Sequence, residues 1–358
     1  MSEVGRMILD TAERIFADSF AKEASRKAAG GAWLPREWAM LEEAGLPLAL
    51  VGEEAGGFGI ETGDALALVG LAARFSVPLP LTETMFANHL LALAKLDIAP
   101  GPASIVMPRA ADTLSLDCAE EGNWMLTGEA VSVPWARHVD SIVLVVGKEC
   151  GGTAEYRLVR VRKGNWTVQG DARSINGAPL DRVSFRAFVT PADCAPLPDG
   201  LGPDIILRGG AALRAIGMAG AIQRVLEMTV EYLQTRKQFG RELSKFQVLQ
   251  HEIAKMAGQS AAAAGAAGIA AEAFANGFAE APIAAAKARA GEAGGIVAAL
   301  AHQLHGAIGV TEEYDLHHLT RQLWAWRDEF GNDAYWNGRL GSLALASPED
   351  LWGFVTAI

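Results

Sequence analysis

The segment TRKQFGRELSKFQVLQHEIAKM runs from Thr235 to Met256 and carries more information than any other part of the chain. Basic residues close a helical pattern, Gly240 follows as a stop signal, and a new amphipathic pattern begins near Phe246. Read from its residues alone, the segment predicts a solvent-exposed corner between two helices.

The chain on both sides of this corner has a helical hydrophobic period. Helices are predicted over residues 205–236, 246–276, 282–305 and 316–326. Alanine and glycine fill many positions in them. Small residues let helices pack closely, and alanine also simply raises helix propensity. The patterns predict a helical bundle over residues 201–358.

The residues before the bundle divide into two zones that differ in their hydrophobic pattern. Short β-type runs separated by Asn, Gly, Asp and Pro predict a small antiparallel barrel or sandwich over residues 103–200. No helical period lies between these runs, which argues against a doubly wound parallel sheet. Residues 1–102 form a helical zone. The expected strands cover residues 104–107, 124–126, 141–146, 156–161, 166–168 and 183–189, and the expected N-terminal helices cover 8–20, 36–43, 64–75 and 82–95.

The composition of the 358-residue chain limits its function classes. Half of the residues are hydrophobic, which is enough for a large core and excludes a disordered chain. Lys and Arg number 31 against 42 Asp and Glu, and the net charge of −11 argues against broad nucleic-acid binding while leaving room for a local basic pocket. The sequence contains no P-loop and no GxSxG turn.

The cysteine, histidine and hydropathy patterns argue against disulfide-rich, metal-binding, secreted and membrane-spanning proteins. Cys118, Cys150 and Cys194 form no CxxC pair, which speaks against a disulfide framework and structural zinc, and for a cytoplasmic location. The histidines between residues 302 and 318 match no zinc spacing, so no metal is expected. The first ten residues lack an apolar signal core, and residues 260–275 are too weakly hydrophobic for a membrane span.

The corner segment resembles the signature of the acyl-CoA dehydrogenase flavoprotein family. That signature reads R-x-x-F-G, F-Q-x-x-Q and A-x-M, and each position is matched between Arg236 and Met256. VGEEAGGFG at residues 51–59 resembles the family's V-P-E-E-x-G-G-x-G turn, and QLHGAIG at residues 303–309 resembles its Q-x-x-G-G-x-G motif, with Ala307 in place of the second Gly. The resemblance covers the whole chain. It implies an α+β fold with an N-terminal helical domain, a middle antiparallel β-barrel and a C-terminal four-helix bundle.

The same resemblance implies FAD as the cofactor. Arginine offers a planar fork for bidentate contact with a pyrophosphate, so Arg236 takes that role, with Gln238 at the phosphates and Phe239 near the adenine. In the family these groups reach the FAD of a neighbouring subunit, so the resemblance also implies a homo- or hetero-tetramer. The other side of the dinucleotide is then held by Gln303, His305, Gly306 and Ala307.

The family removes two hydrogens from an acyl-CoA thioester. A Glu takes the α-proton while the β-hydrogen leaves as hydride to the flavin, and the electrons pass to a carrier such as electron-transfer flavoprotein. The family places this Glu at one of two positions, which here hold Gly210 and Phe330. Glu329 stands one residue from the second position and is the candidate catalytic base. The alternative is a solvated charged corner formed by Glu329 with Arg327 and Asp328.

The middle domain departs from the family as well. Where the family has a W-I-T-like stretch along the flavin ring, this chain has the sequence VPWA at residues 133–136, and Pro134 has no N–H to donate. Relative to the family's motifs, the residues that contact a neighbouring subunit's FAD are thus present. The residues that bind the chain's own flavin ring and perform the chemistry are altered. This contrast predicts the partner subunit of a heteromeric acyl-CoA dehydrogenase. Because some members of the family pair two unlike chains and act on bulky substrates, the resemblance implies a bulky, steroid-like acyl-CoA as the substrate. A self-sufficient homo-oligomer that uses Glu329 and a flavin-free scaffold that reuses the fold are the alternatives.

Overall fold

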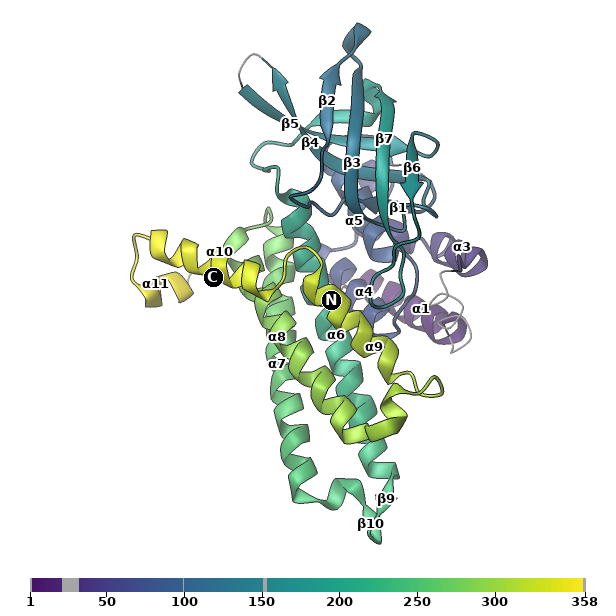
Figure 1. Ribbon diagram of the computed structural model, residues 1–358, viewed down its shortest axis with the longest axis vertical. Helices are drawn as coiled ribbons and strands as arrows, with labels where there is room; N and C mark the ends of the chain where they lie inside the picture. The colour runs from purple at the N-terminus through teal and green to yellow at the C-terminus, as the bar shows by residue number, and fades with distance from the viewer. Residues whose placement is uncertain (1, 21–31, 99, 151–152, 357–358) are drawn as a thin grey trace. The chain divides into compact units, whose positions relative to one another are not determined.

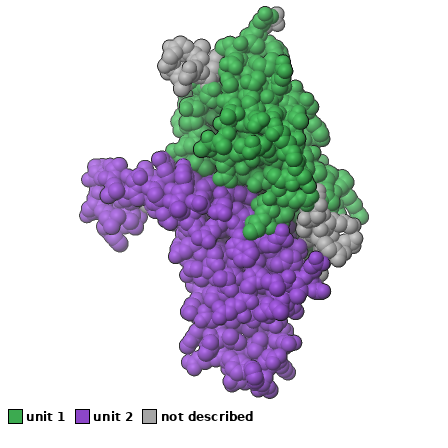
Figure 2. All heavy atoms as spheres, in the orientation of Figure 1, with its two compact units in different colours: residues 1–65, 77–210 green, residues 66–76, 211–358 purple. Residues whose placement is uncertain are grey.

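The computed structural model describes residues 2–20, 32–98, 100–150 and 153–356 (Figure 1). The chain forms two compact units, which Figure 2 shows in different colours. The first unit consists of residues 1–65 and 77–210, and the second of residues 66–76 and 211–358. The predicted order of a helical part, a β-sheet region and a second helical part is confirmed.

The helices of the first unit start at residues that favour a helix start. Ser2 caps the helix that begins at Glu3, because its hydroxyl accepts a hydrogen bond from the Gly5 N–H. Pro35 opens the next described helix at its first turn, as predicted. The helix that begins at Leu81 is buried on nearly all sides, and its Thr84 hydroxyl lies 3.0 Å from both the backbone N and the backbone O of Ala103. These helices are α1 (Glu3–Ser19), α3 (Pro35–Glu43) and α5 (Leu81–Leu93), and the start of α4 (Thr62–Arg74) belongs to the same unit.

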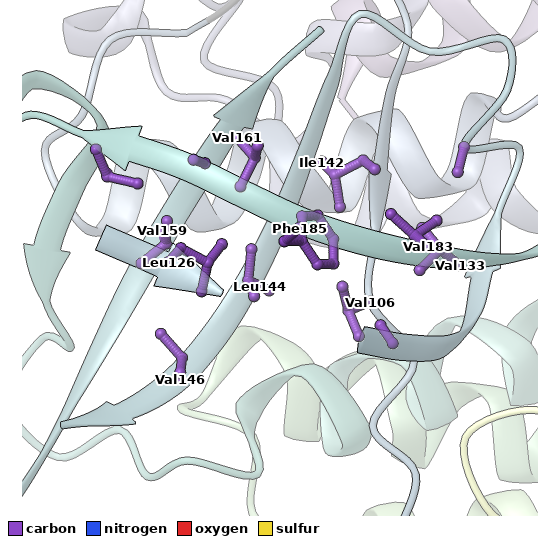
Figure 3. Packing of buried hydrophobic residues seen from close by; sticks show 14 of the residues in the cluster. Val106, Leu126, Val133, Ile142, Leu144, Val146, Val159, Val161, Val183 and Phe185 are labelled. Atoms are coloured by element: carbon purple, nitrogen blue, oxygen red, sulfur yellow. The ribbon is translucent and has the colours of Figure 1, made fainter. Parts of the chain in front are cut away.

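Two four-stranded sheets make up the rest of the first unit (Figure 1). One sheet has the strand order β1-β4-β5-β8 and the other the order β2-β3-β7-β6. Residues of both sheets, among them Leu126, Leu144 and Phe185, meet in one hydrophobic core (Figure 3). The strands are β1 (Ala103–Ile105), β2 (Ser115–Cys118), β3 (Trp124–Pro134), β4 (Ser141–Cys150), β5 (Thr153–Arg162), β6 (Trp166–Gln169), β7 (Leu180–Val189) and β8 (Cys194–Pro196).

The sheets differ from the sequence expectation in two respects. The sequence predicts antiparallel pairs throughout, but β1 runs parallel to β4, with Ala103 opposite Ser141. The two strands are far apart in sequence and are not joined by a hairpin, so the antiparallel rule for adjacent strands does not apply to them. Strands β2 and β8 are absent from the prediction because they contain no β-branched or aromatic residue, the types that are enriched in strands.

The second unit is a helical bundle, in which α7 and α8 lie side by side (Figure 1). Small residues allow close helix packing, as predicted. A Cβ at Gly217 would stand 2.6 Å from the Trp326 ring, and one at Gly220 would collide with the Gly70 carbonyl. Two C-terminal helices lie beyond those predicted. The helices are α6 (Ile205–Thr235), whose first residues belong to the other unit, α7 (Gln247–Ala275), α8 (Glu280–His305), α9 (Leu316–Asp328), α10 (Asp333–Ala346) and α11 (Leu351–Thr356).

The corner between α6 and α7 contains a small hairpin that the sequence reading missed. Strands β9 (Lys237–Gln238) and β10 (Arg241–Glu242) pair across a two-residue loop. Both loop residues, Phe239 and Gly240, have positive φ angles, of 51° and 79°. Two consecutive positive φ angles are typical of the tight hairpin turn that matches the twist of its strands. The loop projects Phe239 from the end of the bundle.

Two of the described helices are long and apolar enough to cross a membrane by length and composition alone: α6, and α8 with the turn after it. Most of α6 is buried within the fold, as in the core helix of a bundle. The sequence predicts that residues 260–275, mostly Ala and Gly, are too weakly hydrophobic for a membrane span. They lie in α7, which is not one of these two helices.

Candidate functional site

The turn between α9 and α10 holds the candidate base Glu329. Phe330 and Gly331 both have positive φ angles, of 53° and 91°. Phenylalanine adopts this left-handed conformation at a cost of about 1–2 kcal/mol. The Trp336 indole N–H supports it by donating a 2.9 Å hydrogen bond to the Phe330 carbonyl. The turn directs the Glu329 side chain inward, and the residue is buried.

Arg214 of α6 meets Glu329 inside the second unit. Its Nε donates to Oε2 of Glu329 at 2.7 Å, and the two side chains are 5% and 10% exposed. The Arg214 guanidinium also lies over the rings of Trp326 and Phe330, 4.8 and 5.6 Å from their centroids. Removing one partner of such a buried pair leaves an uncompensated charge and costs about 3–5 kcal/mol. The pair is therefore held firmly in place.

Lys287 of α8 binds the backbone of the same turn. Its side chain is fully buried, and Nζ donates to the carbonyls of Arg327 at 2.9 Å and Gly331 at 2.8 Å, which flank Glu329 in the chain. Burial lowers the pKa of Lys287 from 10.5 to about 8, against the opposing effect of nearby carboxylates. Lys287 is absent from the residues predicted above. Its place four residues after Ile283, on the buried face of α8, is the sequence signal that would have indicated it.

The two positions at which the resembled family carries its base offer no base here. Gly210 has no side chain, and Phe330 has only a phenyl ring. Asp328 is exposed, and Asp333 accepts a 2.6 Å hydrogen bond from Arg327 Nε. Glu329 is the carboxylate one residue from a family position, and it is bound to Arg214. Its role as a catalytic base stays a prediction.

The β9–β10 hairpin places predicted cofactor-binding residues on the surface. Arg236, Gln238 and Phe239 are exposed, and Phe239 keeps 90% of its surface accessible. Among the described residues, Arg236 has no ion-pair partner, and Lys237 and Arg241 add two further cations. A basic strip with an exposed phenyl ring stands out on a chain with a net charge of −11. It suits an anionic, aromatic ligand that comes from outside the chain.

The turn after α8 carries the second group of predicted residues. Gln303, Gly306 and Ala307 are exposed, whereas His305 is buried. Gly306 has a φ of 64° and a ψ of −144°, and a Cβ built on it would meet nothing within 4 Å. This glycine leaves its main chain open to close approach by a ligand.

The two groups lie at the same end of the bundle. The His305 ring stacks on Tyr232 of α6, with ring centroids 4.5 Å apart. Tyr232 lies one helical turn before Arg236, and His305 directly precedes Gly306. The structure therefore brings the two predicted segments together, although their motifs are far apart in the sequence.

The segment expected along a flavin ring belongs to the core of the first unit. The Pro134 carbonyl accepts a short hydrogen bond from the Ser104 hydroxyl, and Pro134 has no N–H. Trp135 has a φ of 58°, and its ring is 5% exposed. The four residues 133–136 are buried. Because they are buried, they present no open face.

Comparison with known proteins decides the family. Residues 206–335 match the family model described as the C-terminal domain of acyl-CoA dehydrogenase. The chain is 33% identical over 284 residues to acyl-CoA dehydrogenase IpdE2 of Mycobacterium tuberculosis, across 78% of this chain and 77% of that protein. The chain belongs to the acyl-CoA dehydrogenase family.

Solved structures show that this acyl-CoA dehydrogenase chain has the fold that its sequence predicts. A variant of the Tcur3481–Tcur3483 steroid ACAD superposes with a TM-score of 0.83 at 22% identity, over 95% of this chain and 97% of that chain. The ChsE4–ChsE5 complex of Mycobacterium tuberculosis superposes with a TM-score of 0.83 at 19% identity, over 98% and 99% of the two chains.

The residues of this acyl-CoA dehydrogenase chain fit one end of FAD and not the other. The exposed Arg236 guanidinium, the projecting Phe239 ring and the open main chain at Gly306 suit contacts with a pyrophosphate and an adenine. The buried segment at residues 133–136 does not suit contact with a flavin ring. The exposed residues therefore fit the adenine and pyrophosphate end of the dinucleotide.

Proposed function

We propose that this chain is the partner subunit of a heteromeric acyl-CoA dehydrogenase and completes the FAD site of an unlike chain. The reaction is the α,β-dehydrogenation of an acyl-CoA thioester. In this reaction a carboxylate of the unlike chain removes the α-proton. The exposed residues around Arg236 and Gly306 would hold FAD, which would supply the hydride acceptor for the β-hydrogen and a route for the electrons to an external carrier such as electron-transfer flavoprotein.

The observation that carries this proposal is the state of Glu329. A general base must be free to take a proton from the substrate carbon. The Glu329 carboxylate instead accepts a 2.7 Å hydrogen bond from Arg214, in a pair that is almost fully buried. Freeing this carboxylate would leave the Arg214 charge uncompensated. The carboxylate next to the family's second base position is thus engaged in a buried ion pair.

The exposed residues support the second half of the proposal. Arg236 presents its guanidinium fork to a pyrophosphate, Gln238 bonds the phosphate region, and Phe239 packs on the adenine. Gly306 lets the main chain approach the other side of the dinucleotide. These groups bind and orient the cofactor and take no part in proton transfer.

The relatives support an unlike partner and a bulky substrate. Two structures of the same fold bear the names of two chains, Tcur3481–Tcur3483 and ChsE4–ChsE5, and the first is named a steroid ACAD. A steroid-like acyl-CoA is the substrate class that we propose for the complex of this chain with its partner.

A self-sufficient homo-oligomer is the second candidate. It is favoured by the position of Glu329, which lies one residue from a family base position, in a non-helical turn. In a helix a neighbouring residue would point about 100° away, whereas a turn leaves its direction open. This version needs Glu329 to leave Arg214 when the substrate binds.

The deciding experiment is the visible absorption spectrum of the purified chain, expressed alone and together with an unlike acyl-CoA dehydrogenase chain. We expect the chain alone to be folded and colourless, and the complex to be yellow and to oxidise acyl-CoA. A stoichiometric flavin band and acyl-CoA oxidation by the chain alone would overturn the proposal. A complex that forms without flavin would instead support the alternative that the chain is a flavin-free scaffold.

The Arg236→Ala variant tests the role of the exposed strip. We expect it to lower the flavin content of the complex while leaving complex formation intact. Lys255→Ala is the matched control, because Lys255 is an exposed cation on α7 that pairs with Glu252 away from the hairpin. Equal flavin content in both variants would remove Arg236 from the cofactor site.

A further inference from the structure

Three aromatic side chains connect the two exposed segments beneath their surface. His305 is 4% exposed and stacks on Tyr232 with an interplanar angle of 23°. The Tyr314 ring completes the group, 5.1 Å from His305 and 6.3 Å from Tyr232. Tyr232 belongs to α6, His305 ends α8, and Tyr314 lies in the connection to α9. One cluster thus ties three segments together.

The hydrogen bonds of His305 define its protonation state. Nδ1 lies 2.8 Å from the Ala301 carbonyl, which can only accept, so Nδ1 carries the proton. Burial lowers the pKa of His305, which favours the neutral ring, and in the neutral ring Nε2 is an acceptor. The Tyr314 hydroxyl, 3.2 Å away, donates to Nε2. The same hydroxyl lies 3.5 Å from the Met228 carbonyl of α6.

We propose that His305, together with Tyr232 and Tyr314, is a positioning residue that holds the Arg236 hairpin and the Gly306 turn as a single dinucleotide-binding face. This inference rests on the proposed function and adds to it the part of the chain that aligns the face. The Phe239 ring and the Gly306 turn are exposed, so their alignment has to come from other residues of the bundle. In the stack, Tyr232 lies one helical turn before Arg236, and His305 directly precedes Gly306.

The inference changes the role of His305 from cofactor ligand to support. Its ring is closed off by the two tyrosines, and both of its nitrogens have protein partners. The contact with the dinucleotide is left to the neighbouring backbone at Gly306 and Ala307, which is exposed.

Protonation of His305 should loosen the stack. An imidazolium has an N–H at Nε2, so Tyr314 could no longer donate there and would turn its proton toward the Met228 carbonyl. The new charge would also be buried between two rings. The ionisable groups around the cluster are Arg224 and Glu231 of α6, His302 of α8, and Asp315.

The test uses the flavin-containing complex of this chain with its unlike partner. Tyr314→Phe keeps the ring and removes the hydroxyl, and His305→Phe keeps the stack and removes both nitrogens. Tyr335→Phe is the matched control, because Tyr335 lies in α10 and is 44% exposed. We expect Tyr314→Phe to weaken FAD binding about five-fold, the loss of one hydrogen bond. His305→Phe should weaken it more, and the control should leave it unchanged.

A second readout separates positioning from simple loss of stability. NMR titration of His305 should show a higher pKa in Tyr314→Phe than in the wild type, because the variant loses the donor that favours the neutral ring. The FAD affinity of the wild type should decrease as the pH is lowered, because His305 then becomes charged. In Tyr314→Phe this fall should begin at a higher pH.

The outcomes distinguish this inference from the proposed function. If Arg236→Ala releases FAD while Tyr314→Phe and His305→Phe do not, the positioning role is wrong and the proposed function stands. If none of the three variants changes FAD binding, both are wrong. A fall in affinity that matches only a fall in melting temperature, with no change in the pH profile, would also overturn the positioning role.

Discussion

Arg214 and Glu329 face each other from α6 and from the turn after α9, with Arg214 Nε 2.7 Å from Glu329 Oε2. The pair is almost fully buried, and Glu329 is the residue that the sequence suggests as a catalytic base. Around it stand the Trp326 and Phe330 rings and the Lys287 ammonium, which bonds the turn on both sides of Glu329. These contacts make the turn a structural element, and they set the predictions for substitution.

Replacing either member of the pair separates its structural role from a catalytic one. Arg214→Met leaves Glu329 buried without its cation, so we expect a loss of about 3–5 kcal/mol in the free energy of unfolding. Glu329→Gln should also destabilise the chain, yet leave the turnover of the complex unchanged. Urea titrations measure the first effect and steady-state assays the second. Loss of turnover in a folded Glu329→Gln complex would show that Glu329 is the base.

Lys287 should make the stability of the chain rise with pH between about 8 and 10.5. Burial lowers its pKa to about 8 in the folded chain, while the unfolded chain keeps the ordinary value of 10.5. In this window the unfolded chain binds a proton that the folded chain has released, so the free energy of unfolding increases with pH. Below the window both states are protonated and the penalty is complete. The full difference between the two pKa values corresponds to about 3 kcal/mol.

Melting curves of Lys287→Met, taken from neutral pH to about pH 10, check this prediction. The variant has no ammonium to bury, so its stability relative to the wild type should fall as the pH rises: any advantage over the wild type should shrink, and any deficit should grow. Lys255→Met, which removes an exposed ammonium of α7, should run parallel to the wild type. Parallel curves for Lys287→Met as well would show that Lys287 titrates normally.

Gly217 of α6 should be far less tolerant of a methyl group than Gly258 of α7. A Cβ at Gly217 would stand 2.6 Å from the Trp326 ring, and moving that ring disturbs the Arg214 site. We expect Gly217→Ala to destabilise the chain by about 1–3 kcal/mol. Gly258→Ala in α7 should be stabilising by about 0.5–1 kcal/mol, since its Cβ meets open space and alanine favours the helix. Denaturant midpoints of the two variants should therefore shift in opposite directions.

The sequence could predict the family and the long helices because their signals are local. The motif from Arg236 to Met256 and the helical period of α6 to α9 are each read within one continuous stretch. The Arg214–Glu329 pair could not be predicted, because its members are 115 residues apart and the positive φ of Phe330 breaks any helical count through the turn. The hairpin and its projecting Phe239 were hidden for a similar reason, since two-residue strands carry no periodicity.

Phe239 should matter to cofactor binding in the complex and not to the fold of the single chain. Its side chain is 90% exposed, so Phe239→Ser removes little buried surface and should change the free energy of unfolding of the isolated chain by less than about 0.5 kcal/mol. In the complex the same ring is expected to pack on the adenine, where an aromatic contact contributes about 0.5–1.5 kcal/mol beyond the area it buries. Flavin retention after gel filtration should therefore drop several-fold in the Phe239→Ser complex. Phe188→Ser, which removes an exposed ring from β7, should retain flavin like the wild type. Equal retention in both complexes would mean that the hairpin ring does not reach the cofactor.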